Sequence, residues 1–277
     1  MRARRLAVSA VLAVASIAAA AAAPCAPEAE EAPRAVARVL DGETVLLDDG
    51  AEVRLVGALS PRPATLGVPV SDWPPAREAA RALEALVAGR TLVLRYEKGA
   101  RRDRYGRHLA QVYVHAADGL QWVQERLIRS GHARAYALPG RGACLAPLVA
   151  AEEAARSERL GLWREPAFAP RRAADVDALL RLAGRFVLVE GRVASITHRS
   201  RETYVNFDRD WRRDFTAVLP GKMVRETPDA RARLGVLVGR TVRVRGWIER
   251  RNGPSVTLGS LDEIERLEPP SDETPKD

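Results

Sequence analysis

The segment Asp103–Arg107, with the sequence DRYGR, combines residue types that could bind a polyanion. Three further cations, Lys98, Arg101 and Arg102, come just before it. A guanidinium group can pair with a phosphate through two hydrogen bonds, and an aromatic ring can stack on a nucleobase. The pattern is therefore typical of a loop that holds phosphodiester chains. A solvated, arginine-rich hairpin would have the same composition, so the loop alone leaves both interpretations open.

Two predicted strands position this loop. Residues 91–96 form a β-branched, half-apolar run, which Gly99 ends, and a second such run begins near Leu109 and continues to Val114. Upstream, short runs at 35–40, 44–47 and 52–56 are separated by the turn pairs Asp-Gly, which predicts a meander of three strands.

Three helices are expected around these strands. Apolar residues at helical spacing predict helices from Pro74 to Gly89, over 121–130 and over 144–160. Three strands, a helix and two strands describe a small five-stranded barrel of the oligonucleotide-binding type. The predicted fold class is mainly β with flanking helices (α+β), built from two such barrels.

Several motifs between residues 35 and 165 resemble the staphylococcal nuclease family. They are, in order, VLDGET at 39–44, VRL at 53–55, DRYGR at 103–107 and GLW at 161–163. The resemblance implies a Ca²⁺-dependent enzyme in which two arginines hold the scissile phosphate and a glutamate acts as general base. It also implies that the partner is nucleic acid, in single-stranded or denatured form.

The resemblance assigns roles to individual residues. The phosphate-holding arginines correspond to Arg54 and Arg107, and the first metal carboxylate, an aspartate in the family, corresponds to Glu43. Asp41 corresponds to an acid outside the direct metal ligands, and Tyr105 to a ring that holds the nucleotide. In the same loop, the further residues expected to contact substrate are Arg101 and Arg104.

Two family positions carry different residues in this chain. The second metal carboxylate corresponds to Leu59, and the general-base glutamate corresponds to Arg62. Ca²⁺ prefers six to eight oxygen ligands, so one carboxylate leaves the site short of charge and Ca²⁺ binding weak or absent. An arginine cannot accept a proton near neutral pH. The site is therefore expected to bind phosphodiester chains and to have weak or lost hydrolytic activity.

Other interpretations of this site stay open. A replacement carboxylate from Asp72 or Glu78 would restore an active Ca²⁺-dependent secreted nuclease. Alternatively, Arg62 is a third cation that converges with Arg54 and Arg107 on one anion. A structural envelope protein that binds peptide or polysaccharide is a further alternative.

The first 23 residues have the pattern of a secretory signal peptide. Arg2, Arg4 and Arg5 precede an apolar stretch, and small alanines follow it. The expected location is periplasmic or secreted, without stable membrane insertion after cleavage; a retained anchor is the alternative. In an oxidising compartment the two cysteines, Cys25 and Cys144, are expected to form a disulfide.

The net charge of +8 supports an anionic partner, although the dominance of arginine could also reflect genome composition. Residues after the first barrel predict strands at 186–196, 203–207, 215–219, 241–248 and 256–258, with helices at 175–182 and 228–238. Aromatic residues there alternate with arginines, which suits either a clamp for single-stranded nucleic acid or a core with a solvated rim. The residues concerned are Tyr204, Phe207, Trp211 and Phe215, with Arg199, Arg201, Arg209, Arg212 and Arg213.

The sequence thus predicts six segments. They are the signal peptide (1–23), an N-terminal tail (24–34), a staphylococcal-nuclease-like domain (35–165), a linker and short helix (166–183), a second barrel (184–262) and an acidic disordered tail (263–277).

Overall fold

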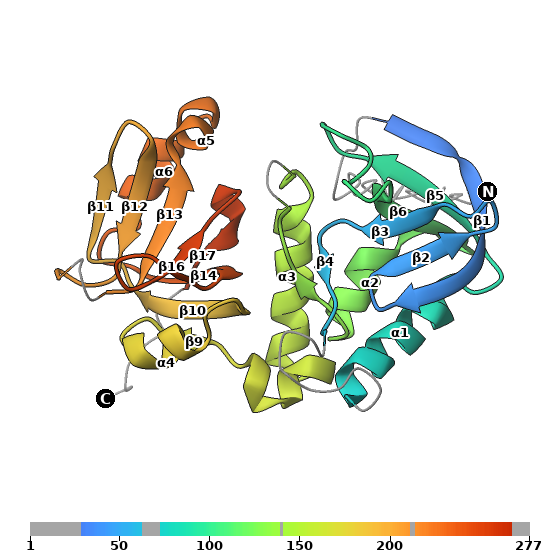
Figure 1. Ribbon diagram of the computed structural model, residues 1–277, viewed down its shortest axis with the longest axis horizontal. Helices are drawn as coiled ribbons and strands as arrows, with labels where there is room; N and C mark the ends of the chain where they lie inside the picture. Colours follow the sequence, from blue (N-terminus) through green and yellow to red (C-terminus); the bar gives the residue numbers. More distant parts are fainter. Residues whose placement is uncertain (1–28, 63–72, 139–140, 211–213, 268–277) are drawn as a thin grey trace, which may run out of the picture.

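The computed structural model describes residues 29–62, 73–138, 141–210 and 214–267. These residues form two lobes side by side, an N-terminal lobe from β1 to α3 and a C-terminal lobe from β9 to β17 (Figure 1). Within this described part of the chain, no helix has the length and apolar character needed to cross a membrane.

A closed five-stranded barrel forms the centre of the N-terminal lobe. Its strands are β1 (Ala29–Asp41), β2 (Thr44–Leu47), β3 (Glu52–Leu55), β5 (Thr91–Tyr96) and β6 (His108–Ala116). The order β3-β2-β1-β5-β6 closes because β3 also pairs with β6, in parallel. Outside the barrel, β7 (Gly119–Trp122) extends β6, and β4 (Ala58–Leu59) pairs with β8 (Arg134–Ala135). The predicted first barrel is confirmed.

Strand β1 begins at Ala29, earlier than the predicted start at residue 35 and inside the predicted tail. Its first residues pair with β5, with Ala29 opposite Tyr96 and Glu30 opposite Arg95. The Arg95 side chain donates to Glu30 across this pair at 2.6 Å. These residues have a polar composition that gives no strand signal, so only pairing with β5 makes them a strand.

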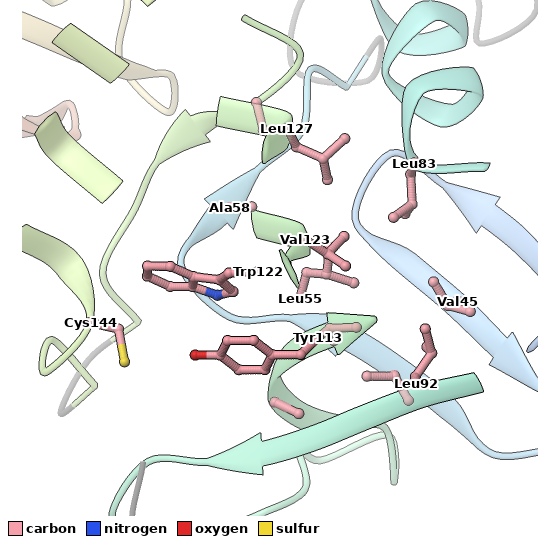
Figure 2. Packing of buried hydrophobic residues seen from close by; sticks show 14 of the residues in the cluster. Val45, Leu55, Ala58, Leu83, Leu92, Tyr113, Trp122, Val123, Leu127 and Cys144 are labelled. Atoms are coloured by element: carbon pink, nitrogen blue, oxygen red, sulfur yellow. The ribbon is translucent and has the colours of Figure 1, made fainter. Parts of the chain in front are cut away.

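Three helices cover the barrel: α1 (Pro74–Val87), α2 (Val123–Arg129) and α3 (Leu145–Ser157). Leu83 of α1 and Leu127 of α2 are fully buried against barrel residues such as Val45 and Leu92 (Figure 2). The regular spacing of these apolar residues explains why the helix predictions agree with the structure to within a few residues.

The C-terminal lobe contains two sheets around its own hydrophobic core. One sheet consists of β9 (Arg171–Arg172), β10 (Phe186–Arg192), β14 (Thr241–Trp247) and β17 (Ile264–Arg266). The other consists of β11 (Ser195–His198), β12 (Glu202–Asn206), β13 (Thr216–Pro220), β15 (Glu249–Arg250) and β16 (Pro254–Thr257). The lobe also has the helices α4 (Val176–Arg181), α5 (Gly221–Glu226) and α6 (Ala230–Gly235). Short 3₁₀ turns are η2 (Gly161–Arg164), η3 (Pro166–Phe168) and η4 (Leu261–Glu263).

This lobe differs from the sequence-based expectation in three places. The strand predicted at 186–196 is divided into β10 and β11, which belong to different sheets. The helix predicted at 228–238 is replaced by α5 and α6, of which α6 ends at Gly235. Residues of the predicted disordered tail form β17, because they pair with β14 and ion-pair with its arginines.

Buried ion pairs and aromatic rings join the two lobes. Arg245 of β14, 1 % exposed, donates to Glu152 of α3 at 2.9 Å, and it also pairs with Glu265. A cluster of apolar side chains from both lobes packs beside this pair. Its buried members are Leu59, Ala155, Leu162, Trp163, Phe168, Phe186 and Leu188.

The predicted signal peptide and Cys25 lie outside the described residues. Cys144 is 1 % exposed at the N-terminal end of α3, beside the barrel core (Figure 2). The disulfide between the two cysteines stays a prediction.

Removal of the Glu152 carboxylate should destabilise the protein strongly. A Glu152→Ala change leaves Arg245 buried with one carboxylate fewer, and loss of one partner of a buried ion pair costs about 3–5 kcal/mol. Urea unfolding of the full chain would measure the free energy. Glu158→Ala, at an exposed position just beyond the same helix, is the control, and an equal loss in both variants would contradict this role.

A second ion pair joins Glu202 of β12 to Arg251 in the turn between β15 and β16, and it shifts the pKa of Glu202. Two hydrogen bonds from Arg251, both 2.7 Å, and one from the Tyr204 hydroxyl, 2.5 Å, lower the pKa of Glu202 from its usual 4.5 to about 2. Because the folded-state pKa is depressed, the pair stabilises the fold fully above pH 4.5, and this contribution is lost as the pH falls toward 2.

An Arg251→Gln change should raise the pKa of Glu202 toward 4.5 and remove this part of the acid dependence. An NMR titration of the Glu202 carboxyl carbon would measure the shift. The neighbouring Arg250→Gln variant is the control, since Arg250 donates to the Leu180 carbonyl instead. An unchanged Glu202 pKa in the Arg251 variant would refute the assignment of the shift to this ion pair.

Candidate phosphate-binding site

The turn between β1 and β2 places Glu43 at one end of the barrel. The Asp41 carboxylate accepts the Glu43 backbone N–H at 2.9 Å, so Asp41 shapes the turn. A Cβ on Gly42 would lie 2.2 Å from the Ser60 hydroxyl oxygen and 2.7 Å from Ala79 Cβ. Only glycine allows this close approach, which brings Glu43 against the segment that follows β4.

The Glu43 carboxylate is fully buried. Its contacts come from β3 and from the segment that follows β4. Its Oε2 accepts the Ser60 backbone N–H at 2.9 Å. Its Oε1 lies 3.4 Å from a terminal nitrogen of Arg54 and forms an ion pair with Arg62. The structure therefore brings together Glu43, Arg54 and Arg62, with the Arg62 side chain 42 % exposed at the outer side.

Arg107 lies near this group from a different hairpin. Burial lowers the pKa of Arg54, and the nearby positive charge of Arg107 lowers it further. Two guanidinium groups that repel each other at a barrel end form a ready site for an anion, because a phosphate would relieve the repulsion.

Asp103 organises the loop that carries Arg107. Its side chain accepts hydrogen bonds from the backbone of Tyr105 at 2.9 Å and of Arg107 at 3.0 Å, and from Arg107 Nε at 2.8 Å. Burial acts to raise the pKa of Asp103, but these hydrogen bonds outweigh it and lower the pKa below 3.8. The carboxylate is thus ionised at neutral pH, and it orients the Arg107 guanidinium.

The aromatic ring of the loop is open to solvent. Tyr105 is 67 % exposed, with the guanidinium carbons of Arg104 and Arg107 at 4.7 and 5.3 Å from its ring centre. Arg101 lies elsewhere, over the Tyr96 ring at 5.1 Å and 3.6 Å from Glu31. Of the predicted substrate-binding residues, the structure places Arg104 and Tyr105 together with Arg107, while the contacts of Arg101 are with β1 and β5.

Leu59, at the position of the second metal carboxylate, is 3 % exposed. It packs in the apolar cluster between the lobes, with Phe186 and Leu188 of β10. This position therefore contributes to packing against the C-terminal lobe.

Tyr136 is a residue of this region that the sequence analysis did not identify. Burial raises its pKa, whereas a hydrogen bond from the Trp247 side chain and the charges of Arg54 and Arg62 lower it. Tyr136 thus lies close to both arginines, and Trp247 of β14 connects it to the C-terminal lobe. The sequence carries no signal for this contact, since the two residues are far apart along the chain.

The donor set does not fit a calcium ion. Glu43 is the one carboxylate that the described residues place between Arg54 and Arg62, and its Oε1 is ion-paired with those two cations. No group of three histidines, cysteines or acids suited to hold a metal occurs in residues 29–62, 73–138, 141–210 and 214–267. Glu78 is exposed on α1 near His132, and Asp72 lies outside the described residues.

Comparisons with known proteins identify relatives of the N-terminal lobe. The family model described as staphylococcal nuclease homologue matches residues 52–165. Endonuclease YncB of Bacillus subtilis is 32 % identical over 137 residues, which cover 49 % of this chain and 63 % of the relative. The SPbeta prophage-derived endonuclease YokF of the same organism is 35 % identical over 128 residues, which cover 46 % of this chain and 42 % of the relative.

A relative from Escherichia coli O157:H7, named an uncharacterized endonuclease, is 34 % identical over 131 residues. The match covers 47 % of this chain and 76 % of that relative. The match to the two Bacillus proteins spans less than two thirds of their length, and the C-terminal lobe lies beyond the family match. The barrel, the motifs and these relatives together show that the chain belongs to the staphylococcal nuclease family.

Proposed function

We propose that this protein binds phosphodiester chains of nucleic acid at the barrel end and hydrolyses them weakly or not at all. Arg54, Arg62 and Arg107 would hold one backbone phosphate, with the Tyr105 ring beside it for a base. Guanidinium groups suit this role because their planar donors match two phosphate oxygens.

The observation that carries the proposal is the ion pair between Arg62 and Glu43. In the family resemblance, these two positions hold the general base and a metal ligand. Here the first is a permanent cation and the second is neutralised by it. General-base assistance contributes about 10²–10⁴ to a rate, and Arg62 cannot supply it.

An active Ca²⁺-dependent nuclease is the second candidate, and the relatives named endonucleases support it. It requires carboxylates beyond Glu43 to complete the metal site. Under either candidate, we also propose that the protein is exported to the periplasm or the medium and that its two cysteines form a disulfide. We further propose that the C-terminal lobe is a barrel of the oligonucleotide-binding type. The support for these proposals is the signal-like N-terminus, the two cysteines and the strand order in the sequence.

Digestion of heat-denatured DNA by the purified protein, with Ca²⁺ and with chelator, separates the two candidates. We expect no cleavage above that of a Glu43→Ala variant. Cleavage that requires both Ca²⁺ and Glu43 would refute the loss of activity and support the second candidate. The Glu43→Ala protein should first be shown to melt as one cooperative unit.

Restoration of the family residues provides a positive control for the geometry. Arg62→Glu with Leu59→Asp should raise Ca²⁺-dependent cleavage by about 10²-fold or more. Because Leu59 is buried between the lobes, an aspartate there costs stability, so the single Arg62→Glu variant should be tested beside it. A folded double variant without any gain would contradict the alignment of these positions.

A Glu43→Gln change should strengthen binding of an oligonucleotide, by up to about tenfold, which is 1.4 kcal/mol. Glutamine keeps an oxygen for the Ser60 N–H but removes the negative charge that competes with phosphate for Arg54 and Arg62. Fluorescence anisotropy with labelled single-stranded DNA would measure the affinity. Glu52→Gln, with the same charge change elsewhere on the barrel, is the control. Weaker binding in the Glu43 variant alone would mean that the carboxylate assists binding.

A further inference from the structure

One face of the five-stranded sheet of the C-terminal lobe packs into the lobe core, and residues of the other face line a hollow. Alternate residues of its strands, such as Val205, Ala217 and Val256, point into the lobe core. The residues between them line the opposite face in matched pairs, with Thr197 opposite Tyr204 and Ser195 opposite Asn206. Apart from Val218, this face consists of hydroxyl, amide, phenol and charged groups, a composition that suits recognition of a polar ligand.

A hollow of about 400 Å³ lies on this face. The strands that line it belong to the C-terminal lobe (Figure 1). Its lining comprises Ser195, Thr197, Arg199, Tyr204, Asn206, Asp208, Arg209, Thr216, Val218, Arg251, Asn252 and Ser255. Ser255 is 1 % exposed, and its hydroxyl has no hydrogen-bond partner among the described residues. A buried, unpaired hydroxyl in the lining is costly unless a bound molecule supplies its partner.

A second hollow adjoins the first, because Arg199 lines both. Its other lining residues are His198, Ser200, Arg225 and Arg231, so its permanent side-chain charges are all positive. Arg225 is held in place by a hydrogen bond to the Ser200 carbonyl at 2.8 Å. The two hollows together form one groove, which we call the sheet groove, with a polar floor at one end and guanidinium groups at the other.

The Tyr204 ring lies in the polar part of the sheet groove, and its hydroxyl donates to Glu202 at 2.5 Å. This hydrogen bond fixes the ring, and Arg251 pairs with the same carboxylate. Among the other aromatic residues noted in the sequence, Phe207 and Phe215 pack in the lobe core, and Trp211 lies outside the described residues. Tyr204 is thus the aromatic residue that the described chain places in this groove.

We propose that the sheet groove is a second binding site, specific for single-stranded nucleic acid and separate from the barrel site. The occupant must be a polyanion, because the groove contains Arg199, Arg209, Arg225 and Arg231 against Asp208 as the acid in its lining. It must also carry planar groups with polar edges, which a fixed ring and a row of hydroxyls can recognise. A nucleic acid strand with exposed bases meets both conditions, whereas a neutral polysaccharide, whose rings are puckered, meets neither.

The sheet groove lies outside residues 52–165, which match the family model. Because it lies on the C-terminal lobe and the first proposed site lies on the N-terminal lobe, one nucleic acid strand, or two separate ones, could contact both lobes. The buried ion pair between Arg245 and Glu152 and the apolar cluster beside Leu59 join the lobes, so the two sites would act at a fixed separation. Such an arrangement raises the affinity for long strands over short ones, since the second contact becomes intramolecular.

The test uses the full chain with Arg54→Gln and Arg107→Gln, which remove binding at the barrel site. Fluorescence anisotropy with a labelled oligo(dT) would measure the binding that remains. Adding Arg199→Gln, Arg225→Gln and Arg231→Gln should weaken it by at least about tenfold and reduce the slope of log K against log salt by about 2. The matched control replaces Arg81, Arg126 and Arg266, which are exposed and line neither hollow.

The contribution of the ring is tested in the same background. Tyr204→Leu should weaken binding by at least about fivefold, as expected for a lost stack on one base. Tyr204→Phe keeps the ring but loses the hydrogen bond to Glu202, so it should weaken binding less than Tyr204→Leu. Equal effects of the groove and control triple variants would overturn the proposal. The proposal would also be overturned if Tyr204→Leu bound the labelled oligo(dT) as tightly as before and if polyphosphate or dextran sulfate competed as strongly as unlabelled oligo(dT). The groove would then bind any polyanion. These outcomes are measured with the barrel-site arginines already replaced, so they do not depend on whether the barrel site binds nucleic acid. The proposed function and the proposed groove can therefore fail separately.

Discussion

A buried negative charge at the end of the barrel determines how the candidate site is built. The Glu43 carboxylate has no exposed surface, and burial of a carboxylate is unfavourable unless it is paired. The Ser60 N–H, Arg54 and Arg62 supply that pairing from β3 and from the segment after β4. In this arrangement Arg62, at the position that the family resemblance assigns to the general base, also neutralises the carboxylate. The proposed phosphate binding and the proposed weak or lost hydrolysis would therefore have one physical origin.

The same argument extends to the contact between the lobes. Leu59 packs against the C-terminal lobe, and Tyr136 receives a hydrogen bond from Trp247 of β14. Arg245 and Glu152, both 1 % exposed, form a further contact between the lobes. A side chain that would hold a metal in the family resemblance thus contributes here to a dry interface. The C-terminal lobe is part of the surroundings of the barrel site as well as the carrier of the sheet groove.

The two proposed sites use different solutions to the problem of binding a polyanion. At the barrel end, arginines converge around one buried position, and the Asp103 hydrogen bonds hold the Arg107 guanidinium in place. In the sheet groove, arginines lie along a path over a polar floor. The first geometry suits a single phosphate, whereas the second suits successive phosphates and bases of a strand.

The sequence by itself determined the barrel and its helices, and it supplied Glu43, Arg54, Arg62 and Arg107 as candidates for the proposed phosphate site. Asp-Gly turns, apolar spacing and the DRYGR loop are local signals, and local signals specify local structure. The tertiary structure decided what those signals could not contain. The polar start of β1 became a strand through pairing with β5, and β17 formed where the sequence predicts disorder, because Glu265 meets Arg243 and Arg245. The pairing of Arg62 with Glu43, and the contact of Tyr136 with Trp247, join residues distant in sequence, so only the folded chain defines them.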